Sequence, residues 1–148
     1  MRTRVVFLGA LIVGVIDLVF AILYWIQLVS PIRIFQSIAA GLLGGKASRD
    51  GGIATAILGG VLHFAIATAM AFTYALAARK LPVLVRQPTL FGLVYGVLLY
   101  LAMNLVVLPL SARGMPSFAD HAWVASSVAM HAVFGLIIAH TARIALRA

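Results

Sequence analysis

The clearest pattern in this sequence is a series of long apolar runs separated by short polar or Gly/Pro-containing segments. The hydrocarbon core of a bilayer is about 30 Å thick and an α-helix rises about 1.5 Å per residue, so a crossing needs about 20 apolar residues. Four segments meet this requirement: Val5–Val29, Gly52–Ala78, Thr89–Ser111 and Ala122–Leu146. The pattern therefore predicts an all-α integral membrane protein, with residues 1–148 forming a single transmembrane domain, a bundle of four helices.

The segment between the first two spans, Ser30–Gly51, contains an amphipathic pattern of its own. Its stretch Ile32–Leu43 is too short to span a bilayer, and Arg33 and Gln36 lie off its apolar stripe. The stripe consists of residues at helical spacing, Ile34, Ile38 and Leu42. We predict a short interfacial or re-entrant helix that ends at Gly44–Gly45 and either seals the mouth of the bundle or acts as a lid that contacts a ligand.

Composition excludes a water-soluble globule. Apolar residues make up 64% of the chain and charged residues 9%, whereas soluble domains average about 45–50% and about 25%. There is no cysteine and no glutamate, and the three carboxylates are Asp17, Asp50 and Asp120. These absences exclude disulfides, thiolate chemistry and cysteine-ligated metals, and the loops offer no nucleophile–base pair at a recognisable spacing. We therefore expect neither an enzyme nor a metal site.

The formal net charge of +8 reflects basic residues at the ends of the apolar runs, where they anchor spans, and not a nucleic-acid-binding patch. Four crossings place both termini on one side. That side carries seven basic residues: Arg2, Arg4, Arg79, Lys80, Arg86, Arg143 and Arg147. The opposite side carries four: Arg33, Lys46, Arg49 and Arg113. The excess predicts that both termini are cytoplasmic, with the lipid bilayer as the principal partner and no nucleic acid.

Four polar residues lie within the predicted spans: Asp17, His63, Asn104 and His131, one in each helix. A polar group at bilayer depth costs on the order of kcal/mol, so such groups normally face the bundle interior and have partners. Small residues at four-residue spacing flank Asp17, His63 and His131, as is typical of faces where membrane helices approach closely. We therefore predict an intramembrane polar layer at similar depth, with the orientation of Asn104 the least defined.

Three interpretations of this layer remain open. In the first, an Asp17–His63 hydrogen bond and contacts of the other two residues fix helix register. In the second, the layer conducts a proton or ion, because an imidazole beside a carboxylate titrates near physiological pH. In the third, His63 and His131 ligate a b-type haem. The leading functional prediction is a non-enzymatic structural or accessory subunit without a cofactor, acting as a homo-oligomer or within a larger membrane complex.

Scattered glycine, proline, histidine and tyrosine positions resemble those of the YagU-like group of uncharacterised bacterial inner-membrane proteins. The matching features are Pro31 with Ile38–Gly41, Gly60, His63, Ala71, Tyr74, Pro82, Gly92, Gly96, Asn104, Leu108–Leu110 and His131. The first external loop and the C-terminus are shorter here than in that group. The resemblance implies a small multi-pass protein of a bacterial inner membrane, and it implies no catalytic residues.

Overall fold

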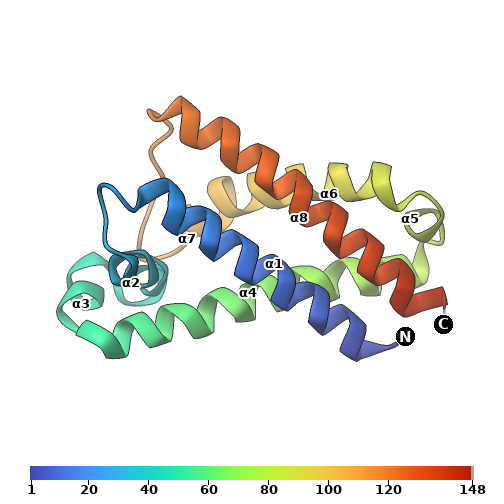
Figure 1. The fold of residues 1–148 in the computed structure, drawn as a ribbon, viewed down its shortest axis with the longest axis horizontal. Coiled ribbons are helices and arrows are strands. Elements are labelled where there is room, and N and C mark those ends of the chain that lie inside the picture. The colour runs from blue at the N-terminus through green and yellow to red at the C-terminus, as the bar shows by residue number, and fades with distance from the viewer. Residues whose placement is uncertain (148) are drawn as a thin grey trace.

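The computed structural model describes residues 1–147 and is helical throughout its regular structure (Figure 1). Four helical spans are long and apolar enough to cross a membrane: α1 (Thr3–Trp25), α4 (Gly52–Lys80), the third span (Pro88–Leu110) and α8 (His121–Arg147). The short helix α2 (Pro31–Leu43) lies between the first two spans. The predicted fold class is confirmed, and the chain is a multi-span membrane protein.

The two termini lie together at one end of the bundle (Figure 1), where the backbone N–H of Arg2 donates a hydrogen bond to the carbonyl of Ala145 at 2.9 Å. We call this the terminal end and the opposite end, where α2 lies, the α2 end. The buried core is concentrated toward the terminal end and is built largely from alanines of α4 and α8 with Val6 and Ile138. Small side chains let helix backbones approach closely, which matters in lipid because the hydrophobic effect does not drive helices together there.

The closest helix pair is formed by α8 and α6 (Pro88–Ala102), the first part of the third span. A Cβ atom at Gly96 would collide with the carbonyl oxygen of His131, and one at Gly135 would collide with the carbonyl oxygen of Gly92. Glycine at these positions therefore permits backbone-to-backbone contact that any larger residue would prevent. This contact fixes His131 relative to the third span.

A turn of π-helix, η1 (Met103–Val107), interrupts the third span between α6 and the short α7 (Leu108–Leu110). Pro109 has no N–H to donate, and in a continuous α-helix its ring would clash with the carbonyl four residues earlier. The wider turn closes instead through the N–H of Leu108, which donates to the carbonyl of Met103. Proline thus explains why the helix is irregular where the predicted polar residue Asn104 lies.

α2 lies across the end of the bundle: Figure 1 shows it nearly end-on, while α1 and α4 run across the view. It packs on α4, where a Cβ atom at Gly59 would collide with the carbonyl oxygen of Phe35. The predicted helix is confirmed, but its predicted stripe is partly wrong. Leu42 is 62% exposed, whereas Gln36 is 3% exposed.

Gln36 is buried because its side-chain amide has acceptors on the segment that follows. Its Nε2 donates to the carbonyl of Gly52 at 2.9 Å, and its own backbone carbonyl accepts a hydrogen bond from the hydroxyl of Ser48. Ser48 belongs to α3 (Gly45–Asp50), an element that the sequence pattern did not predict. Gly44, at φ +78°, ends α2 as predicted, but Gly45 begins α3 instead of extending the break.

The two remaining connections are short. The connection between the second and third spans contains one helical turn, α5 (Val83–Arg86). The connection between α7 and α8 has no regular helix and is attached to α2, because the N–H of Ala112 donates to the carbonyl of Gly41 at 2.8 Å. This attachment places the third connection over the mouth of the bundle.

Candidate functional site: an intramembrane cavity

A cavity of about 530 Å³ occupies the half of the bundle nearest α2. It lies between the third span on one side and α1 and α4 on the other. It is on the α2 side of the hydrogen bond that the Tyr95 hydroxyl donates to the carbonyl of Met70 at 2.8 Å. Its walls include Asp17 and Leu18 of α1, His63 and Ala67 of α4, Met103 and Asn104 of η1, His131 and Phe134 of α8, and Ile34 and Ser37 of α2. Most of this lining is apolar, with a few polar groups converging on the interior, which is typical of ligand sites.

Asp17 and His63 form one polar wall of the cavity. Nε2 of His63 lies 2.9 Å from the carbonyl oxygen of Gly14 and 4.0 Å from Oδ2 of Asp17. Because a carbonyl oxygen only accepts hydrogen bonds, Nε2 carries the proton in this arrangement. The predicted Asp17–His63 hydrogen bond is therefore replaced by a hydrogen bond to the α1 backbone, with the carboxylate close by.

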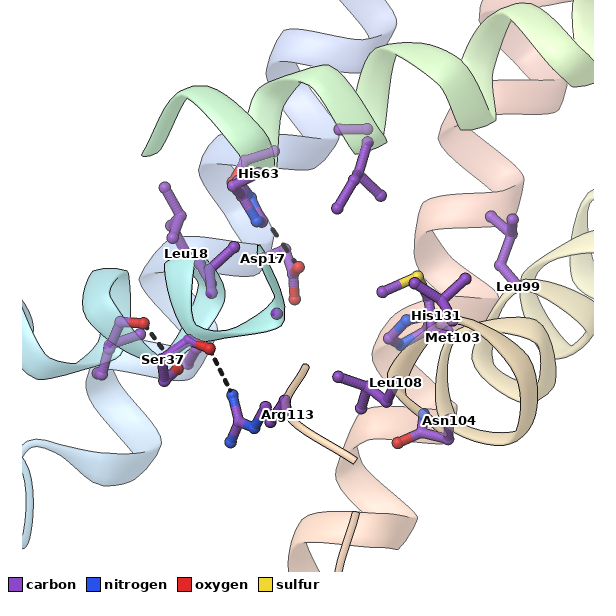
Figure 2. Close-up of a pocket in the computed structure, with 18 of the residues that line it drawn as sticks. Asp17, Leu18, Ser37, His63, Leu99, Met103, Asn104, Leu108, Arg113 and His131 are labelled. Atoms are coloured by element: carbon purple, nitrogen blue, oxygen red, sulfur yellow. Dashed lines mark hydrogen bonds and ion pairs between the residues drawn. The ribbon is translucent and has the colours of Figure 1, made fainter. Parts of the chain in front are cut away.

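The carboxylate of Asp17 faces the cavity (Figure 2). Its side chain is 35% exposed, against 12% for His63. Within residues 1–147, the neighbouring imidazole is the one charged or chargeable partner within 4.0 Å of this carboxylate, and no donor forms a hydrogen bond to it. A carboxylate at this depth without a donor is expensive, so the site favours a bound proton, a cation or water at Asp17.

The opposite wall carries Asn104 and His131, which Figure 2 shows across the cavity from Asp17. Each bonds to its own helix: Nδ2 of Asn104 donates to the carbonyl of Tyr100 at 2.9 Å, and Nδ1 of His131 donates to the carbonyl of Ser127 at 2.8 Å. The ring of Tyr100 packs edge-on against that of His131, with centroids 5.5 Å apart. His131 therefore keeps Nε2 as a hydrogen-bond acceptor.

Two arginines line the mouth of the cavity at the α2 end, Arg33 and Arg113. Arg113 donates from Nη1 to the carbonyl of Ser37 at 2.9 Å, and Arg33 donates to the side chain of Gln36 at 3.1 Å. Partial burial of the guanidinium lowers the pKa of Arg113, although the residue as a whole is exposed at the mouth. The group stays cationic at neutral pH because its ordinary pKa is far above 7.

An aromatic cluster borders the same mouth where α1 ends and α8 begins. Phe20 stacks on Trp123 at 5.4 Å between ring centroids, and Tyr24 and Trp25 pack against the same indole. The Tyr24 hydroxyl donates to Asp120, whose Oδ1 accepts from the N–H of Trp123 at 2.9 Å. The cluster joins α1 to α8 at the level where aromatic residues favour a membrane interface.

The structure places all four predicted polar-layer residues around one cavity, where Asp17 and His63 lie 4.0 Å apart and, within residues 1–147, no two of the four side chains are hydrogen-bonded to each other. Sequence reasoning did not identify Arg33 and Arg113 as cavity residues, nor Ser37 on the inner face of α2. A cue was present for Arg33, since it lies on the predicted amphipathic helix. No cue was present for Arg113, because the path of an irregular connection is set by contacts with residues distant in sequence.

Ligation of a haem by His63 and His131 stays a prediction. Nε2 of His63 is engaged by the Gly14 carbonyl, whereas Nδ1 of His131 donates to the Ser127 carbonyl and leaves Nε2 of His131 free. In the part of the chain that the structure describes, no group of three or more His or Asp residues is arranged to hold a metal ion. The chemistry that this geometry offers is the exchange of a proton between Asp17, His63 and a cavity ligand or water.

Comparisons of the chain with protein-family models, with curated proteins and with solved structures give no match. The resemblance to the YagU-like group therefore stays a prediction.

Proposed function

We propose that this protein is a non-enzymatic transport component of a membrane, in which Asp17 and His63 bind and release a proton or small cation. The observation that carries the proposal is the position of the Asp17 carboxylate, which faces a cavity and has no hydrogen-bond donor among residues 1–147. Intramembrane carboxylate and imidazole pairs that line cavities are the usual parts of proton relays.

The arrangement of hydrogen bonds favours this role over a purely structural one. If the four polar residues only fixed helix register, they would be expected to bond one another across helices. His63 alone among them makes a hydrogen bond to another span, and its acceptor is a backbone carbonyl. Asn104 and His131 satisfy themselves within their own helices and leave polar atoms available to the cavity.

A structural or accessory subunit is the second candidate. The contact of α6 with α8 through Gly92, Gly96 and Gly135 favours it, because such close contact makes the terminal end a rigid unit that suits assembly. In this case the partners that co-purify with the protein from its native membrane would define its role.

Proton flux into liposomes that contain the purified protein distinguishes the two candidates. We expect Asp17→Asn to reduce flux by roughly tenfold or more, because the amide keeps the shape of the side chain and cannot take up a proton. Asp50→Asn is the matched control, since Asp50 pairs with Lys46 at 3.2 Å on the surface, away from the cavity. Equal flux through parent and Asp17→Asn liposomes would contradict the proposal.

The imidazole allows a parallel test. His63→Gln should reduce flux, while His140→Gln should not, because His140 is exposed and its Nε2 lies 3.2 Å from the Thr89 hydroxyl outside the cavity. Both proteins should keep their helical circular dichroism. A loss of stability in His63→Gln without any change in flux per folded molecule would favour the structural candidate.

A further inference from the structure

A second hollow, of about 420 Å³, lies at the terminal end of the bundle between α5 and the last turns of α4 and α8. Three arginines line it, Arg79, Arg86 and Arg147, one from each of these helices. The apolar residues Pro82, Val85 and Leu146 also line it. The lining of the hollow therefore combines three cationic side chains with apolar ones.

The backbone that carries two of these arginines is held in place by defined contacts. The Tyr74 hydroxyl, from the buried face of α4, donates to the carbonyl of Leu84 in α5 at 3.2 Å. The N–H of Leu81 continues the α4 hydrogen-bond ladder to Ala77, and α5 ends with the N–H of Gln87 donating to Val83. Arg79 and Arg86 are thus presented by a fixed turn.

Among residues 1–147, the positive charge of this hollow has no nearby counter-charge. The three carboxylate side chains of the chain lie elsewhere, with Asp17 inside the first span and Asp50 and Asp120 at the α2 end. In the described residues, 1–147, none of the three guanidinium groups forms an ion pair, and none donates a hydrogen bond to a protein acceptor. Planar guanidinium groups in such a position suit a phosphate group, which accepts paired charge-assisted hydrogen bonds.

The level of the hollow along the spans indicates which kind of phosphate group would reach it. Arg79 and Arg147 lie in the last turns of membrane-spanning helices, where lipid headgroups are found. Toward the interior of the bilayer, Leu76 and Ile144 are 49% and 57% exposed on the same two helices, where acyl chains would contact them. We propose that this hollow is a binding site for the headgroup phosphate of an anionic phospholipid.

Native mass spectrometry of the detergent-solubilised full chain with added phosphatidylglycerol tests the proposal. The test variant replaces Arg79, Arg86 and Arg147 with glutamine. The control replaces Arg2, Arg4 and Arg143, which removes the same charge from the same end of the molecule outside the hollow. Each guanidinium that donates a charge-assisted hydrogen bond to the phosphate contributes about tenfold in affinity, so the test variant should retain phosphatidylglycerol at least about 100-fold less well than the parent.

The control variant should retain this lipid to within about threefold of the parent, because its arginines do not line the hollow and only screened long-range attraction is lost. Equal losses in both triple variants would assign the effect to diffuse charge and overturn the site. Phosphatidylcholine retention that matches phosphatidylglycerol retention would overturn it as well. Millimolar inorganic phosphate should not displace the bound lipid. Complete displacement would assign the hollow to a soluble phosphate and overturn the lipid proposal.

All six substituted arginines lie on the surface or at its edge, so both triple variants are expected to fold. Helical circular dichroism and gel filtration check this before lipid is added. Neither set of residues touches the cavity that contains Asp17. The outcome is therefore separate from that of the flux experiment.

Discussion

Single residues explain why polar groups are tolerated inside this bundle. Gln36 is buried because the carbonyl of Gly52 accepts its amide, and His63 is nearly buried because the carbonyl of Gly14 accepts its ring N–H. In each case a backbone oxygen that already belongs to a helix provides the acceptor. Both of these donors are thus satisfied by backbone carbonyls of the scaffold, whereas the buried hydroxyl of Ser127 has no hydrogen-bond partner among residues 1–147.

The cost of burying charge made part of the site predictable. Asp17, His63 and His131 stand out in the sequence because hydrocarbon should exclude them, and each lines the cavity. The bonding of Asn104 was not predictable, because it depends on a π-helical turn. Arg113 was not predictable either, since its position depends on a hydrogen bond to Ser37, a residue far away in sequence.

Two adjacent glycines of α4 allow a matched test of the contact between α2 and α4. Gly59→Ala should lower the free energy of unfolding by about 1–3 kcal/mol, because its Cβ would overlap the Phe35 carbonyl and force the helices apart. Gly60→Ala should be neutral or slightly stabilising, since its Cβ would lie 3.6 Å from the Phe35 ring and alanine favours the helix.

Thermal unfolding of both proteins in detergent, followed by circular dichroism, measures this difference. Equal melting temperatures for the two variants would show that α2 is not seated on α4 as described.

At the scale of elements, the third span differs most from an ideal transmembrane helix. The apolar run predicted its length to within about one residue at each end but not its internal change of helix type. Hydropathy depends on which residues are apolar, whereas a π-helical turn depends on the missing N–H of Pro109 and on how neighbouring helices accommodate it. α3 was also missed, because six mostly polar and small residues show no apolar periodicity.

The third span permits a direct test of whether water enters the cavity. The chain contains no cysteine, so single cysteines can be introduced without removing others. Asn104→Cys places a thiol in the cavity wall, whereas Leu105→Cys places one at a position that is 54% exposed on the outer surface of the bundle, toward lipid. Because the reactive form is the thiolate, which needs water, a water-soluble maleimide should modify position 104 roughly tenfold faster or more.

Mass spectrometry of protein in sealed vesicles gives the two modification rates. Comparable rates at positions 104 and 105 would contradict a hydrated cavity.

At the scale of the whole molecule, the two ends of the bundle differ. Toward the terminal end the helices pack closely through glycine and alanine, whereas toward the α2 end they enclose the cavity that contains Asp17, and α2 crosses that end. Apolar patterning predicted the four spans and the short helix, because these follow from the thickness of the bilayer. The cavity was not predictable, since it results from the divergence of helices whose tilt depends on neighbours and not on their own composition.

Orientation in the membrane is a prediction that belongs to the intact molecule. Because seven basic side chains gather at the terminal end and four at the α2 end, we expect both termini in the cytoplasm. Alkaline phosphatase, which needs an oxidising compartment, should be inactive when fused after residue 148 and active when inserted between residues 114 and 117. The reverse pattern of activity would show that the molecule is inverted.

The attachment of the third connection to α2 has a mechanical consequence. The amide of Ala112 donates a hydrogen bond to the carbonyl of Gly41, and the guanidinium of Arg113 donates one to the carbonyl of Ser37. The connection between α7 and α8 is therefore attached to α2 at two points. If α2 moves outward, the attached connection moves with it, and this displaces the π-helical turn that carries Asn104. Opening of the cavity mouth and a change in the cavity wall that carries Asn104 would then occur together, because only a few residues connect the two.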